Sequence, residues 1–119
     1  MALEWAAQVI GIKDYPNYTT LSPLTATAED AEKIAQQLEQ YGYSTFRVQR
    51  LPGISNQKGE SKIDPQGMVN MKELREAIAN LFNPPHPNPI PETALFFFSG
   101  HGWEQTVNGK KEVFLATSD

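Results

Sequence analysis

The chain of 119 residues contains no cysteine. Disulfides, thiolate metal sites and a cysteine nucleophile are therefore all excluded within these residues. Long apolar runs are also missing, and none approaches the roughly 20 residues that span a bilayer. The first four residues, Met-Ala-Leu-Glu, lack the positive charge with which a secretory signal begins. We therefore expect a cytoplasmic protein that has no membrane partner.

An excess of positive charge is absent as well. Ten basic side chains stand against 14 acidic ones, which gives a net charge of -4. Neither sign is gathered into blocks, so the chain offers no basic face to a nucleic acid. Its apolar fraction of 39 % and charged fraction of 20 % are typical of one small folded domain. The sequence has no glycine-rich phosphate motif, and we expect neither a metal nor a cofactor.

Apolar patterns in the first third predict a strand and then a helix. The run from Trp5 to Ile12 ends in β-branched residues and predicts a strand that is buried on both faces. From Ala28 to Tyr41 apolar residues recur at intervals of three and four, so that they share one helical face. Thr27 and Asp30 have the spacing of a capping box, and Gly42 suits the end of this helix.

The middle of the chain repeats this order. Residues 43–51 alternate between apolar and polar and predict a second strand. Residues 54–69 have no periodicity, and we expect a long loop without regular structure. Asn70 and Glu73 have the spacing of a capping box before a second helix, which must end before Pro84. The apolar face of that helix consists of Met71, Leu74, Ala77, Ile78 and Leu81.

The last third adds two strands. Five prolines between residues 84 and 91 predict a stiff, extended link in which His86 is solvated. Ala94 to Phe98 is an unbroken apolar run and predicts a central parallel strand, and Val113 to Ala116 predicts a shorter fourth strand. Alternating strands and helices imply right-handed crossovers. We therefore expect an α/β fold: one domain with an open, mostly parallel sheet and helices on both faces.

A candidate site follows the apolar strand. Open parallel sheets bind ligands outside the carboxyl ends of their strands, where the loops converge. Ser99-Gly100-His101-Gly102 lies at such an end and places His101 between two glycines. From position alone, two interpretations stay open: a functional imidazole, or a glycine turn whose histidine faces water.

The segment from Ala94 to Gly102 resembles the strand and histidine turn of caspase-like cysteine peptidases, which include the caspases, the metacaspases and related bacterial enzymes. Three further segments resemble that family in its own order. Val9 to Ile12 resembles its first strand, and Leu24 to Ala31 resembles its Leu-x-x-x-x-Asn-Asp-Ala segment. Phe114 to Asp119 resembles the strand and loop after the histidine. Together the matches span nearly the whole chain.

The resemblance implies roles for three residues. His101 matches the general base of a Cys-His dyad, which takes the thiol proton and later protonates the leaving amine. Gly102 matches the position whose backbone N–H binds the oxyanion. Asp30 matches a substrate-pocket acid that pairs with Lys or Arg before the cleaved bond in metacaspase-like members. Asp30 equally suits a capping acid, and Glu29 stands where the family usually has Asn.

The resemblance also implies a missing part. Caspases carry the nucleophilic cysteine roughly 50 residues after the histidine, whereas the sequence ends eighteen residues after His101. We therefore expect the N-terminal part, residues 1–119, of a peptidase domain that is incomplete at its C-terminus and inactive alone. Its expected partners are a peptide or protein substrate, the missing cysteine-bearing segment and further copies of itself. A calcium requirement, known in some metacaspase-like relatives, stays open.

Alternatives to this interpretation remain. The cysteine can be supplied by the rest of a longer chain or by a separate chain, or the domain can be a cysteine-free module. In the last case it is a non-catalytic binding or scaffold domain. A flavodoxin-like or receiver-like module would need more acids at the first strand end than Asp14. The aromatic residues Tyr15 and Trp103 lie close to the expected cleft as exposed candidates, and we assign neither of them a substrate contact.

Overall fold

The structure is a computed structural model that describes residues 5–16, 21, 24–41 and 46–119. Gly42, the predicted end of the first helix, and residues 43–45 of the predicted second strand lie outside these residues. Within them, no helix is long and apolar enough to cross a membrane.

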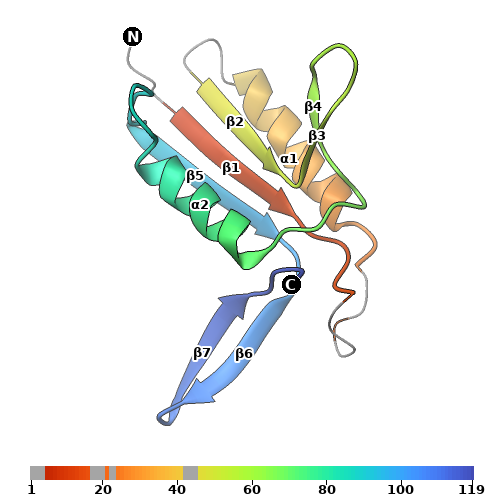
Figure 1. The fold of residues 1–119 in the computed structure, drawn as a ribbon, viewed down its shortest axis with the longest axis vertical. Coiled ribbons are helices and arrows are strands. Elements are labelled where there is room, and N and C mark those ends of the chain that lie inside the picture. The colour runs from red at the N-terminus through yellow and green to blue at the C-terminus, as the bar shows by residue number, and fades with distance from the viewer. Residues whose placement is uncertain (1–4, 17–20, 22–23, 42–45) are drawn as a thin grey trace.

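A three-stranded parallel sheet forms the centre of the molecule (Figure 1). Its order is β2 (Phe46–Leu51), β1 (Trp5–Gly11) and β5 (Thr93–Ser99). Ala7 lies opposite Val48 on one side and Leu95 on the other. The predicted parallel sheet is confirmed, and β1 is buried from Ala6 onward, as expected.

The central position predicted for β5 is wrong for the described residues, because β1 is the central strand and β5 lies at an edge. An unbroken apolar run reports that both faces of a strand are covered. The run does not indicate whether both edges of the strand are hydrogen-bonded, so the sequence could not distinguish a central strand from an edge strand.

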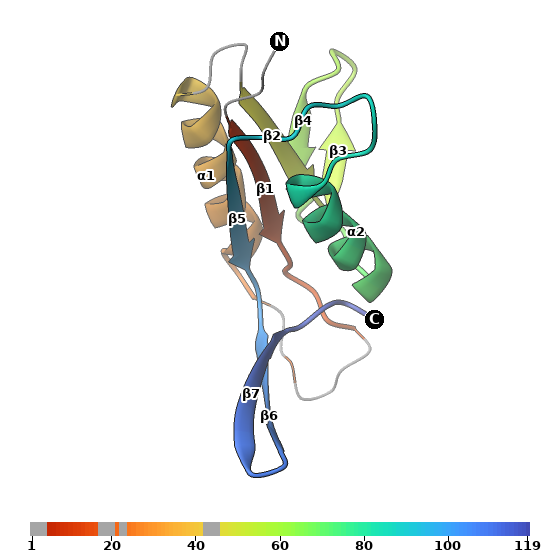
Figure 2. The same ribbon diagram turned by 90° about the vertical axis from the view of Figure 1, so that its left-hand side faces the viewer.

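Helices cover both faces of the sheet, as predicted. Figure 2 shows α1 (Thr27–Tyr41) on one side and α2 (Met71–Phe82) on the other. Strand side chains alternate between two cores. Val9 and Phe97 pack with the alanines of α1, whereas Ile10, Phe96 and Phe98 pack with Leu74 of α2 and its neighbours. The approach of α1 is close: a Cβ on Gly11 would lie 2.7 Å from the Cβ of Ala31.

The two predicted capping boxes have different outcomes. At α2 the Asn70 side chain accepts from the Glu73 N–H, and the Glu73 carboxylate accepts from the Asn70 N–H, so the capping box is confirmed. At α1 the prediction is wrong. The Asp30 N–H donates to the Ala26 carbonyl, so the helix starts one residue early. The Thr27 hydroxyl is buried and has no hydrogen-bond partner among the described residues.

Two antiparallel hairpins lie outside the parallel sheet, and both were mispredicted. The predicted loop of residues 54–69 overlaps two strands, β3 (Gly53–Ser55) and β4 (Ser61–Ile63), which pair with each other. The Asn56 side chain shapes their turn by accepting two backbone N–H groups. Strands of three residues are too short for a period-two pattern, so the sequence predicted a loop instead.

The second hairpin follows the parallel sheet and projects away from it (Figure 1). It consists of β6 (Gly102–Val107) and β7 (Lys110–Leu115). The sequence missed β6, and the fourth strand that it predicted over residues 113–116 corresponds to the end of β7, which pairs with β6 and not with the parallel sheet. A signal was present, because Asn108-Gly109 is typical of a two-residue hairpin turn that needs two positive φ angles. The observed values are 52° and 77°.

An ion-pair network joins β2 to α1. The guanidinium of Arg50 donates to the carboxylates of Glu32 and Glu39, with closest N–O distances of 3.0 and 2.6 Å. Glu32 also accepts the Ile63 N–H of β4 at 2.8 Å. Burial by itself raises the pKa of Glu32, but the hydrogen bonds and the charge of Arg50 outweigh burial and lower the pKa below its ordinary value. The network therefore favours an ionised Glu32.

Candidate active site

His101 lies where the sequence predicted it, just past the carboxyl end of β5. The adjacent end of β1 is held there by a hydrogen bond of 2.9 Å from the Ile12 N–H to the Ser99 carbonyl. After these strand ends, the chain turns into β6 at Gly102. Gly100 and His101 are therefore the two residues between the parallel sheet and the hairpin, and His101 is half-buried.

A buried tyrosine holds the backbone of His101. The Tyr15 side chain, only 3 % exposed, accepts the His101 N–H at 2.9 Å and donates to the Ala116 carbonyl at 3.1 Å. The Ala116 N–H in turn donates to the His101 carbonyl at 2.9 Å. An antiparallel pair normally exchanges two direct hydrogen bonds. At the pair His101–Ala116, the Tyr15 hydroxyl takes the place of one of them.

The aromatic ring of Tyr15 also contacts the imidazole. The two ring centroids lie 4.9 Å apart, with an edge-to-face angle of 66°, an arrangement that aromatic rings favour. Burial raises the pKa of the Tyr15 phenol, and the His101 N–H, which lowers it, does not cancel the effect. The hydroxyl therefore stays protonated near neutral pH and can donate to Ala116.

Gly100 makes this contact sterically feasible. A Cβ at this position would lie 2.6 Å from the Tyr15 hydroxyl oxygen and 2.9 Å from Cζ of Phe98, and real Cβ atoms do not approach so closely. The glycine before His101 is thus required by the approach of Tyr15, which the sequence did not predict.

The Gly102 N–H points away from the hairpin partner. Hydrogen-bonded and non-hydrogen-bonded pairs alternate along an antiparallel ladder. Because His101 and Ala116 form a hydrogen-bonded pair, Gly102 and Leu115 do not exchange bonds. Gly102 is exposed, and a Cβ added there would meet no atom closer than 3.8 Å. This geometry suits an N–H that donates to an oxyanion from outside the hairpin.

Asp30 lies on the same edge of the sheet but apart from His101. Its side chain is exposed in the first turn of α1, which packs against the end of β1 at Gly11. The structure therefore brings Tyr15 and Gly100 to His101, whereas a substrate role for Asp30 stays a prediction.

An apolar groove begins close to the histidine. A cavity of about 600 Å³ lies between α2 and the hairpin. Trp103, opposite Phe114 in the ladder, lines it and is half-exposed. The two aromatic candidates thus differ: Trp103 is accessible, whereas Tyr15 is buried, so its expected exposure is wrong. Among the described residues no cluster of three or more His, Asp or Glu could hold a metal ion, and His86 is exposed in the proline link.

Comparison with known protein families gives one finding. The family model of the caspase domain matches residues 5–119 of the chain. No curated protein and no solved structure matches it. The matched range includes the whole parallel sheet, the Tyr15–His101 contact and the hairpin after it.

Proposed function

The chain belongs to the caspase-domain family of cysteine-type peptidases, and from this premise we propose that His101 is the general base of a Cys-His dyad whose cysteine lies outside these 119 residues. One observation carries the proposal. His101 lies at the carboxyl end of β5, its backbone is fixed by the Tyr15 hydroxyl, and the N–H of the next residue is free of the hairpin ladder.

The chemistry assigns each group a step. The His101 imidazole takes the proton of the cysteine thiol, and the thiolate attacks the carbonyl carbon of the scissile peptide bond. The carbonyl electron pair moves to oxygen, and the Gly102 N–H donates to that oxyanion. The C–N bond then breaks as protonated His101 gives its proton to the leaving amine. Water, deprotonated by His101, finally hydrolyses the thioester.

The free edge of β5 supports a place for the cysteine. Among the described residues no strand pairs with this edge, and Phe96, Phe97 and Phe98 are only half-buried. A strand that paired with β5 in parallel would end at the same edge of the sheet as His101. We therefore propose that the cysteine-bearing segment extends the sheet along β5, whether it comes from the same chain or from another.

Asp30 supports a preference for Lys or Arg before the cleaved bond. Its exposed carboxylate lies in the turn of α1 that packs against the end of β1, at the edge where His101 lies. A carboxylate pairs well with a guanidinium or an ammonium. Asp30→Asn should lower kcat/KM for Arg and Lys peptides by roughly 10- to 100-fold. The neighbouring exposed Glu29→Gln should leave it unchanged, and equal losses in both variants would refute the assignment.

The peptidase assignment is tested on the complete protein. Initial rates on peptides that end in Arg or Lys before a reporter group should fall by at least about 100-fold in His101→Ala. The chain offers a matched control, because His86 is the only other histidine and is exposed. His86→Ala should cleave normally. Unchanged cleavage by His101→Ala would refute the role of His101, whereas no cleavage by the unchanged protein would favour a non-catalytic binding or scaffold domain.

Three further questions concern the setting of the protein: self-association, location and calcium. The exposed apolar residues of the hairpin, Val113, Phe114 and Leu115, support self-association, because such surface favours contact with another chain. Sedimentation of Val113→Lys against the unchanged protein tests this. The proposed cytoplasmic location is tested by cell fractionation, and a calcium requirement by cleavage assays with a chelator.

A further inference from the structure

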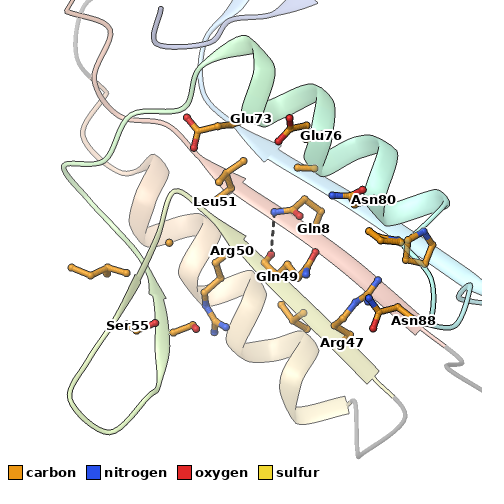
Figure 3. A pocket seen from close by; sticks show the side chains of 17 residues that line it. Gln8, Arg47, Gln49, Arg50, Leu51, Ser55, Glu73, Glu76, Asn80 and Asn88 are labelled. Atoms are coloured by element: carbon orange, nitrogen blue, oxygen red, sulfur yellow. Dashed lines mark hydrogen bonds between the residues drawn. The ribbon is translucent and has the colours of Figure 1, made fainter. Parts of the chain in front are cut away.

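A second cavity lies away from His101, over strand β2. It measures about 730 Å³ and is bounded by β2, α2 and the proline link (Figure 3). Side chains of β2 alternate, so that Arg50 bonds to α1 while Arg47 and Gln49 face the opposite side. On that opposite side α2 packs over β1 and β5. The polar side chains of β2 are thus left uncovered by the helix, and they form the floor of the cavity.

The Nε atom of Arg47 lacks an acceptor in the part of the chain that the structure describes. This atom is buried and has no hydrogen-bond partner there, and no carboxylate among the described residues pairs with the guanidinium. Arg50, three residues later, shows the usual solution, since its side chain is 4 % exposed and bonds to two glutamates. A buried donor without an acceptor costs free energy. Arg47 therefore requires an acceptor that these residues do not supply, and a carboxylate suits its planar donors best.

The other end of the cavity is acidic. Figure 3 shows Glu73 and Glu76 near Leu51, whereas Arg47 points toward Asn88 at the far end. Glu73 accepts a hydrogen bond in the helix cap. Glu76 has only a solvent-exposed ion pair with Lys72 at 4.0 Å. Arg47 and Leu51 are four residues apart on β2, which corresponds to roughly 13 Å along the strand.

Amide side chains lie between these two ends. Gln8 of β1 is 3 % exposed, and its side-chain amide donates to the Gln49 carbonyl at 3.4 Å. Asn80 and Asn88 also line the space. Such groups can donate to and accept from a peptide backbone.

We propose that this cavity binds a short zwitterionic peptide of two or three residues, with its C-terminal carboxylate on Arg47 and its N-terminal ammonium toward Glu76. An extended tripeptide spans about 10 Å, which fits between the two charged ends. The volume lies in the range of small-ligand sites. Polyanions such as nucleotides are disfavoured, because Glu73 and Glu76 repel them. The proposal is independent of His101 and of the peptidase assignment.

Isothermal titration of the complete protein with triglycine tests the site. We expect saturable binding in the unchanged protein, weakened at least about tenfold in Arg47→Gln. Lys58→Gln removes an exposed cation of the β3–β4 turn, outside the cavity, and should bind normally. Triglycine amide, which lacks the carboxylate, and N-acetyltriglycine, which lacks the ammonium, should each bind more weakly to the unchanged protein. These two ligands keep the test decisive even where Arg47→Gln fails to fold.

Other outcomes overturn the proposal. No binding at about 10 mM triglycine would do so, because that concentration detects even weak complexes. Equal affinity for triglycine and its amide would show that no group recognises the carboxylate. His101→Ala should retain the affinity of the unchanged protein, and a loss there would place the peptide at the active site instead. Loss of peptidase activity in His101→Ala with triglycine binding retained would support both proposals separately.

Discussion

Replacing Tyr15 by phenylalanine removes one hydroxyl and leaves the ring that packs against His101. In the structure this hydroxyl bridges the His101 N–H and the Ala116 carbonyl, at 2.9 and 3.1 Å. The two backbone groups cannot simply bond to each other in the variant, because the hydroxyl oxygen separates them in the unchanged protein. Direct pairing would require the start of the hairpin to move toward the sheet by roughly the width of an atom.

The expected loss follows from these two hydrogen bonds. Each buried backbone group that loses its partner costs about 1 kcal/mol or more. We therefore expect Tyr15→Phe to lower the free energy of unfolding by about 2 kcal/mol. Because the same hydroxyl fixes the backbone of His101, kcat should also fall by roughly tenfold, while KM changes less.

Denaturant unfolding and initial-rate kinetics on the complete protein measure the two effects. Tyr41→Phe is the matched control, since Tyr41 is 77 % exposed at the end of α1 and should change neither quantity. The reasoning is refuted if Tyr15→Phe unfolds within about 0.5 kcal/mol of the unchanged protein and cleaves at the same rate.

Three further predictions concern stability. Gly100→Ala should destabilise the protein by about 1–3 kcal/mol in denaturant unfolding, because its Cβ would meet the Tyr15 hydroxyl at 2.6 Å. An unchanged free energy of unfolding would contradict this and show that the Tyr15 side chain moves to make room for the added methyl group. The pKa of Glu32 is lowered on folding, so its contribution is present above the unfolded pKa and is lost as the pH falls through the lower folded value. Melting temperatures from pH 6 to pH 2.5 should therefore fall less steeply in Glu32→Gln, and parallel curves would contradict this. Asn70→Ala should cost about 1 kcal/mol by removing the cap of α2, and thermal unfolding without a change would contradict the capping box.

The sequence predicted the elements whose side chains face a core. The helical spacing from Ala28 to Tyr41 and the apolar run from Ala94 to Phe98 became α1 and β5, because burial of one face or two imposes a clear pattern. β6 could not be found in this way, since nearly all its residues are exposed and each of its faces carries polar side chains. Only the Asn108-Gly109 turn marked that hairpin.

The site was predicted only in part, because local sequence patterns do not indicate contacts between distant residues. His101 could be placed because strand and glycine signals surround it in the sequence. Its contact with Tyr15 joins residues that lie 86 positions apart in the sequence. Local patterns do not predict contacts over such a separation. The cavity at Arg47 could not be predicted either. The alternation of side chains along β2 predicts which face of the sheet Arg47 occupies, but it does not predict that α2 leaves this face uncovered.

The central claim, that His101 serves a cysteine beyond these residues, is tested most directly by the pH dependence of cysteine alkylation. An isolated thiol reacts with iodoacetamide as it ionises near pH 8.5, whereas a thiolate paired with a protonated histidine reacts at lower pH. In the complete protein, one cysteine should be alkylated at pH 6 at least about tenfold faster than in His101→Ala, with His86→Ala unchanged. The account is contradicted if His101→Ala leaves the alkylation profile of every cysteine unaltered, or if the complete protein contains no cysteine that reacts.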